Sequence, residues 1–234
     1  MQACRALHPT GLRETPLRAV LVTNGDVDHV AGLLSLREQS AFTLFATSDI
    51  HAILDDNPIF EALDRDHVAR RAVALGDDFE LLPGLVARLF AVPGKVPLFM
   101  EGETVETGLV GEQTVGVRLD DGRCVAYYVP GCAEVTDDLR ARLADADHVF
   151  FDGTLWRDDE MIALGLGYKT GARMGHVSMS GPDGAMARLE GLVAGKTFIH
   201  INNTNPVWQP DSSERRAVEA AGWGIAADGM EIAI

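Results

Sequence analysis

Apolar and polar positions along the chain form short runs with two different periods. Runs rich in β-branched and aromatic residues and bounded by turn residues predict strands, whereas apolar residues three or four positions apart predict helices. In the first half, strands are predicted at 18–23, 42–47, 69–75 and 84–92, and helices at 30–38 and at 48–56, the latter with Ser48 as its N-cap. This alternation predicts an α/β protein.

A hairpin in the middle of the chain adds antiparallel pairing. Residues 114–129 form two predicted strands on either side of a turn at Asp121 and Gly122, which argues against a purely parallel sheet. Further on, the pattern predicts helices at 137–144, 158–163, 182–193 and 213–221, strands at 148–153 and 197–202, a glycine-rich loop at 165–176 and two short strands at the C-terminal end.

The composition is that of a single globular unit. With 234 residues and 47% apolar side chains, the chain can form one domain, residues 1–234, whose core needs no disulfides. The cysteines Cys4, Cys124 and Cys132 show no C-x-x-C spacing, which favours a reducing compartment. No apolar run approaches the roughly 20 residues of a membrane helix, and the N-terminus lacks the apolar stretch of a signal peptide. We therefore predict a cytoplasmic protein without membrane contact.

The charge narrows the range of partners. The net charge is -15, and binding to nucleic acid requires clustered Lys and Arg side chains that the sequence does not show. We therefore expect no nucleic-acid partner. The sequence is compatible with a homodimer.

The most informative segment is 18–33, where an apolar strand leads into Asp28 and His29. A strand end fixes the side chains that follow it, and a carboxylate beside an imidazole is a frequent beginning of a divalent metal site. Taken alone, Asp28 is equally well explained as a helix N-cap, and His29 as a partly buried polar side chain.

Several longer segments, spread from Ala6 to the C-terminus, resemble one known family. They read, in order, TNGDVDHVAGLLSLRE, YYVPG, FFDGTLWRDDEMI, KTGARMGHVSMSGPDG, FIHINNTNP and AVEAAGWGIAADGMEI. Positions 24–29 resemble the H-x-H-x-D-H signature of the metallo-β-lactamase superfamily, with the final Asp-His pair kept and both leading histidines replaced. Together, the segments resemble the pyrroloquinoline quinone biosynthesis protein B family of that superfamily.

The resemblance implies a fold and a feature of the N-terminus. The expected architecture is the metallo-β-lactamase-like αββα sandwich, of the α/β (α+β) class, with a metal cleft at one sheet edge. Members of the family carry several strands and a cysteine-rich zinc-binding segment before the Asp-His loop, whereas residues 1–23 precede it here. We therefore expect an N-terminally shortened chain in which the first strands are missing.

The resemblance also implies a site for one metal ion, with Asp28, His29 and His200 as ligands. His200 follows the apolar run TFI; without the resemblance, a lone histidine there would more often be structural. Two imidazoles and one carboxylate leave open positions on Fe(II) for substrate and for dioxygen as co-substrate. Zn would accept the same ligands.

Two departures from the hydrolytic relatives argue against a two-metal hydrolase. Where those relatives carry a bridging aspartate, this chain has Pro130-Gly131, and proline offers no ligating side chain. Where they often carry another histidine, this chain has Gly94 and Lys95. A centre without these groups is poorly suited to clamping both oxygens of a phosphodiester.

Further residues have both a functional and a structural interpretation. In related enzymes a histidine near His176 faces the cleft, and we expect His176 to be the catalytic acid or base rather than a loop histidine. Asp152 is expected to orient a metal-bound histidine through its second nitrogen, with a turn cap as the alternative. Asn24 and Asp26 occupy the positions of the lost histidines and would bind substrate, hold water or shape the turn.

The remaining candidates are polar residues that could contact a substrate. Three cations are expected to contact substrate carboxylates: Lys95, Lys169 and Arg173. A polar cluster after His200 suits a polar substrate or stabilises a turn; its members are Asn202, Asn203, Thr204 and Asn205.

The function implied by the resemblance is a step of pyrroloquinoline quinone biosynthesis. The family is understood as an iron-dependent oxygenase that hydroxylates the tyrosine-derived ring of a small-molecule precursor, itself derived from a Glu-Tyr cross-linked peptide. Two alternatives stay open. One is a non-catalytic carrier of the quinone or its precursor for export, and the other is a single-metal zinc hydrolase.

Overall fold

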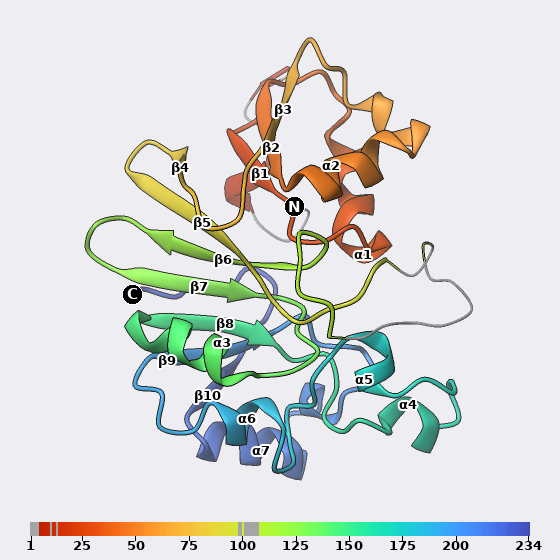
Figure 1. Ribbon diagram of the computed structural model, residues 1–234, viewed down its shortest axis with the longest axis vertical. Helices are drawn as coiled ribbons and strands as arrows, with labels where there is room; N and C mark the ends of the chain where they lie inside the picture. Colours follow the sequence, from red (N-terminus) through yellow and green to blue (C-terminus); the bar gives the residue numbers. More distant parts are fainter. Residues whose placement is uncertain (1–4, 10, 13, 98–99, 101–107) are drawn as a thin grey trace.

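Two β-sheets form the frame of the molecule (Figure 1). The computed structural model describes residues 5–9, 11–12, 14–97, 100 and 108–234. The smaller sheet has three parallel strands in the order β1-β2-β3, namely β1 (Ala19–Leu21), β2 (Phe42–Ala46) and β3 (Val68–Ala72).

The larger sheet is mixed and has the strand order β10-β9-β8-β7-β6-β5-β4. Its strands are β4 (Asp78–Leu82), β5 (Leu85–Ala91), β6 (Val115–Asp120), β7 (Val125–Val129), β8 (His148–Asp152), β9 (Gly195–Ile199) and β10 (Trp223–Ile225). Strands β4 to β7 pair antiparallel, and β7 to β10 pair parallel. The hairpin predicted around Asp121 and Gly122 is therefore confirmed as β6 and β7.

The α-helices are short. They are α1 (Val27–Val30), α2 (Ser48–Asp55), α3 (Asp137–Arg142), α4 (Glu160–Ala163), α5 (Gly171–Met174), α6 (Ala185–Arg188) and α7 (Ser213–Ala220). Short 3-10 turns occur at Arg5–Leu7, Ala31–Leu36, Pro58–Ala62, Leu143–Asp145 and Pro206–Trp208.

The side-chain alternation of β2 separates two layers of the core. Leu44 packs with Ile50 and Leu54 of α2 on the outer face of the smaller sheet. Its neighbour Phe45 points to the opposite face and stacks on Phe79 of β4, with ring centroids 5.2 Å apart. Because successive residues of a strand point to opposite faces, one apolar strand supplies both layers. The two sheets therefore pack face to face.

The same alternation in β5 builds the third core layer. Leu89 faces the smaller sheet, whereas Phe90 faces the other side and contacts Tyr127, with ring centroids 5.7 Å apart. Leu139 of α3 and Val218 of α7 complete this outer cluster. The order of layers is helix, sheet, sheet, helix, so the αββα sandwich expected from the sequence is confirmed.

Several details differ from the sequence-based expectations. Thr47, not Ser48, caps α2, because the extended backbone at Thr47 lets its hydroxyl accept from the Ile50 amide at 3.3 Å. Strand β4 was not predicted, because Phe79 is its one fully buried residue. The helix expected at 182–193 is reduced to α6, between its N-cap Gly184 and Gly191, which has a φ of 76°.

Other differences concern the second half of the chain. The segment 165–176, predicted as a loop, contains α5. Strand β9 ends at Ile199, before His200. After β10, the structure has no further strand. Within the described residues, Cys124 and Cys132 form no disulfide, and Cys4 lies outside them. No helix in the described part of the chain has the length and apolar character needed to cross a membrane.

Candidate metal centre

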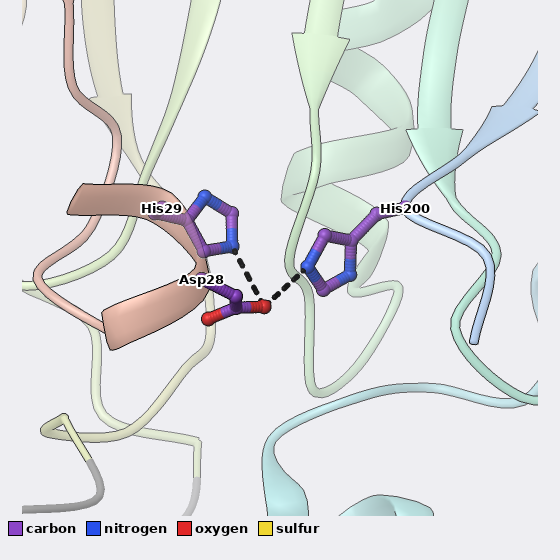
Figure 2. A group of neighbouring side chains, drawn as sticks. All are labelled: Asp28, His29 and His200. Atoms are coloured by element: carbon purple, nitrogen blue, oxygen red, sulfur yellow. Dashed lines mark hydrogen bonds and ion pairs between the residues drawn. The ribbon is translucent and has the colours of Figure 1, made fainter. Parts of the chain in front are cut away.

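Asp28 and His29 of α1 converge with His200, which follows β9 (Figure 2). The Asp28 carboxylate approaches a nitrogen of each imidazole, with its Oδ2 atom 3.0 Å from Nε2 of His200 and 3.9 Å from Nε2 of His29. The three ligand atoms lie within 4.8 Å of one another. One carboxylate oxygen and two imidazole nitrogens are a donor set that both Fe(II) and Zn accept, so the residues present fit one divalent ion.

The loop between β1 and α1 places the first two of these residues. The side chain of Asn24 accepts a hydrogen bond from the Asp26 amide at 2.9 Å, and the Asp26 carbonyl accepts from the His29 and Val30 amides. A Cβ atom on Gly25 would lie 2.9 Å from the Ile53 side chain, so only glycine permits this close approach of the loop to α2. Asn24 and Asp26 therefore shape the loop that presents Asp28 and His29.

His200 is held in an uncommon backbone conformation. Its φ is 54°, and Gln39 is the one other non-glycine residue with a positive φ in the described chain. The loop after β8 fixes the backbone on both sides of it, because the Gly153 amide donates to the Ile199 carbonyl at 2.8 Å and the Asn202 amide donates to the Thr154 carbonyl at 3.1 Å. A non-glycine residue with positive φ is strained and is typical of functional sites.

Asp152 lies behind the histidines and is fully buried. Its Oδ2 atom accepts from Nδ1 of His176 at 2.7 Å and from the Cys132 amide at 3.0 Å, and its Oδ1 atom accepts from the Thr154 hydroxyl at 2.6 Å and the Thr154 amide at 3.1 Å. Its direct histidine partner is His176, whereas Nδ1 of His200 is 3.9 Å away and reaches it through Thr154. Thr154 was missed in the sequence, where it appears only as a small polar residue after β8.

The three imidazoles form a stack. The ring centroids of His29 and His200 are 4.8 Å apart, and those of His176 and His200 are 5.3 Å apart. Asp152, His176 and His200 make a second group of three ligand-type atoms within 4.8 Å. Because the oxygens of Asp152 already accept four hydrogen bonds from the protein, the group around Asp28 is the better metal site.

Electrostatics favour the metal-binding charge state for two of the three ligands, Asp28 and His29. The hydrogen bond from His200 lowers the pKa of Asp28 to about 2, and burial lowers the pKa of His29. For His200, burial opposes protonation, but the hydrogen bond to Asp28 and the charge of Asp152 outweigh it and raise the pKa. Burial would raise the pKa of Asp152, yet His176 and Thr154 hold it below its ordinary value. The Asp28 carboxylate is therefore ionised near neutral pH, and the lowered pKa of His29 favours its neutral, metal-binding form, whereas the raised pKa of His200 opposes that form.

A cleft of about 530 Å³ opens in front of the centre. Its lining contains Asp26, Asp28, Lys95, Thr154, Met161, Lys169, Met174, His176, His200, Ile201 and Asn202. The Lys95 ammonium lies 3.6 Å from the Asp26 carboxylate. A larger hollow of about 650 Å³ lies over β5 to β7, but it shares no lining residue with this cleft, and Arg88 and Arg118 there pair with neighbouring aspartates. The smaller cleft is therefore the candidate substrate site.

The predicted polar residues divide into two groups. Lys95, Lys169 and Asn202 line the cleft, whereas Arg173 of α5 is not part of its lining. The others are structural or exposed: Asn205 is buried and donates to the Gly153 carbonyl at 3.0 Å, Thr204 donates to Glu160 at 2.6 Å, and Asn203 is exposed.

The fold and the ligand cluster define a class of protein. A family model described as a beta-lactamase superfamily domain matches residues 1–201. The metallo-β-lactamase-fold protein YhfI from Bacillus subtilis, at 12% identity, superposes with a TM-score of 0.65 over 92% of this chain and 76% of that chain, which shows the fold alone. The chain is a member of the β-lactamase superfamily and has the metallo-β-lactamase fold.

Closer relatives specify the family. The coenzyme PQQ synthesis protein B of Ruegeria pomeroyi is 65% identical over 234 residues, which cover 100% of this chain and 79% of that protein. The crystal structure of Zn(2+)-bound PqqB from Methylobacterium extorquens, 51% identical, superposes with a TM-score of 0.96 over 100% of this chain and 79% of that chain. The chain belongs to the coenzyme PQQ synthesis protein B family. It therefore has a role in the biosynthesis of coenzyme PQQ.

Proposed function

We propose that this protein is a non-haem, Fe(II)-dependent hydroxylase of pyrroloquinoline quinone biosynthesis. Its substrate is the small-molecule precursor derived from a Glu-Tyr cross-linked peptide. The tyrosine-derived ring, as a catechol, takes up one oxygen atom of dioxygen as a hydroxyl group and supplies two electrons by becoming a quinone, so that the other oxygen atom leaves as water. The observation that carries the proposal is the convergence of Asp28, His29 and His200 at the cleft. Two imidazoles and one carboxylate are the ligand set of non-haem Fe(II) oxygenases.

The metal would be held by Oδ2 of Asp28 and by Nε2 of His29 and His200. A ferrous ion bound there supplies the one-electron chemistry needed to activate dioxygen. His176 manages a substrate proton: Asp152 fixes its Nδ1 atom as a donor at 2.7 Å, so Nε2 keeps a lone pair that accepts a proton from a phenolic hydroxyl. The side chain of His176 is 18% exposed and lines the cleft.

The lining of the cleft supports an acidic substrate. The protein has a net charge of -15, yet the cleft contains two ammonium groups, those of Lys95 and Lys169. Asp26 and Asp28 also line the cleft, and Lys95 lies 3.6 Å from Asp26, so these lysines balance the acidic lining, and a divalent ion at Asp28 would make the cleft attractive to carboxylates. Met161, Met174 and Ile201 supply apolar surface for a ring.

The decisive test is reconstitution of the metal-free protein with Fe(II) under anaerobic conditions, followed by oxygen uptake on a dihydroxyphenylalanine-containing surrogate of the precursor. We expect one iron per chain and uptake that depends on the surrogate. Tight surrogate binding without uptake would contradict the proposal and favour the carrier. Activity with zinc alone, with release of a cleaved ester, lactone or phosphodiester, would favour the hydrolase.

Replacing the two lysines of the cleft should weaken substrate binding and leave the metal in place. For Lys95→Gln and Lys169→Gln, we expect KM to rise about tenfold each, since a hydrogen bond to a charged group contributes about 1.5 kcal/mol. Steady-state oxygen uptake and iron content measure the two effects. Lys196→Gln is the matched control, because this ammonium donates to the Leu192 carbonyl outside the cleft. Loss of iron with an unchanged KM would contradict the assigned role.

A further inference from the structure

The hydroxyl of Thr154 lies at the centre of the group behind the metal centre. Its Oγ1 atom is 2.6 Å from Oδ1 of Asp152, 2.8 Å from Nδ1 of His200 and 3.1 Å from Nδ1 of His176. It is also 3.1 Å from the His200 carbonyl oxygen. Thr154 itself is 8% exposed, so water does not compete freely for these contacts.

The hydroxyl has a single proton, which decides the direction of these bonds. The proton goes to Oδ1 of Asp152, because this oxygen is the nearest partner and a charged acceptor binds more strongly than a carbonyl. The lone pairs of Oγ1 are then left to accept. His176 already donates its Nδ1 proton to Oδ2 of Asp152, so the Thr154 hydroxyl accepts from Nδ1 of His200.

We propose that Thr154 is a positioning residue that presets His200 for metal binding. By accepting from Nδ1, it leaves Nε2, which donates to Asp28 at 3.0 Å in this structure, as the nitrogen that gives up its proton when the metal binds. Asp152 thus orients the rings of two histidines: it contacts His176 directly and His200 through the Thr154 hydroxyl. The inference rests on the proposed metal site, and its test needs no turnover.

The backbone around Thr154 makes this arrangement rigid. A Cβ atom on Gly153 would lie 2.9 Å from Cβ of Phe198 and 3.1 Å from the Ile199 carbonyl, so glycine brings the loop after β8 against the end of β9. The buried side chain of Asn205 donates to the Gly153 carbonyl at 3.0 Å from the far side. With both backbones held, the Thr154 hydroxyl has a fixed place relative to the His200 ring.

Metal titration of three variants tests the inference. Zn(2+) is titrated into the metal-free proteins against a competing chelator, and thermal unfolding of the metal-free proteins is recorded in parallel. Thr154→Val keeps the shape and removes the hydroxyl, and should weaken Zn(2+) binding about 10- to 100-fold, the range known for partners that orient a ligand. Thr154→Ser keeps the hydroxyl and should stay within about threefold of the wild type.

Thr197→Val is the matched control. Thr197 is also buried and also contacts a histidine, with Oγ1 3.0 Å from Nε2 of His148, away from the cleft. Its substitution should change thermal unfolding and leave Zn(2+) affinity unaltered. Equal losses in Thr154→Val and Thr197→Val, or an affinity in Thr154→Val equal to that of the wild type, would overturn the inference. So would a loss in Thr154→Ser as large as that in Thr154→Val.

One further measurement covers the case in which a variant does not fold. If Thr154→Val does not fold, proton NMR of the Zn(2+)-loaded wild type decides: the Nδ1 proton of His200 should exchange slowly and show a nuclear Overhauser contact to Thr154, and its absence overturns the inference. Failure of this inference can be distinguished from failure of the proposed function. If the proposed function is wrong, the iron-loaded wild type takes up no oxygen. If the role of Thr154 is wrong, only the Zn(2+) affinities of the variants differ from those expected.

Discussion

Replacing His200 by alanine should abolish stoichiometric metal binding. The substitution removes one of three donors whose atoms lie within 4.8 Å of one another, and it leaves the Asp28 carboxylate without its 3.0 Å partner. We expect affinity for Fe(II) and Zn(2+) to fall by more than about 100-fold, since loss of a ligand should exceed the effect of losing a group that only orients one. Elemental analysis after anaerobic reconstitution and chelator competition measure the loss.

The control for this prediction is a histidine that resembles His200 in local setting but lies outside the cleft. His148 begins β8 and contacts Thr197 at 3.0 Å, so His148→Ala removes a partly buried imidazole without touching the candidate ligands. Iron should remain at one equivalent in that variant. Full retention of metal in His200→Ala, with the protein folded, would refute the ligand set of Asp28, His29 and His200.

Sequence analysis predicts least well the contacts between residues that lie far apart in the chain. Asp28 and His29 are adjacent in the chain and follow an apolar strand, so a metal site could be suspected from local pattern. His200 lies 172 residues from Asp28, and no local pattern links them. Its assignment depended on family resemblance, because the packing of the smaller sheet on the larger one, which brings the segment after β1 to the segment after β9, is not encoded in any short segment.

The role of Thr154 could not be predicted for a related reason. A hydroxyl has no preferred partner until the fold places a carboxylate and an imidazole on either side of it. The strand β8 and the acidic residue at its end were predicted from the apolar run, whereas the order of the layers was expected from the family resemblance. Arg173 was grouped with Lys169 by closeness in sequence, but α5 places it outside the lining of the cleft.

Replacing His176 by glutamine should separate proton transfer from metal binding. Glutamine retains an amide that can donate to Asp152 but cannot accept a proton at neutral pH. We expect kcat for oxygen uptake to fall about 10²- to 10⁴-fold, the usual contribution of a general acid or base. Metal affinity should stay near that of the wild type, and KM should change little. His148→Gln serves as the matched control for kcat.

This variant also decides between the two groups of ligand-type side chains. His200 belongs to both, so its removal cannot tell them apart, whereas His176 belongs only to the group that contains Asp152. Loss of metal from His176→Gln would mean that the ion binds beside Asp152. That arrangement would have to displace hydrogen bonds that this buried carboxylate accepts from the Cys132 and Thr154 amides. Leaving a buried amide without a hydrogen-bond partner costs about 1–3 kcal/mol. We therefore expect the ion to bind at the group around Asp28, which leaves His176 available to accept the substrate proton.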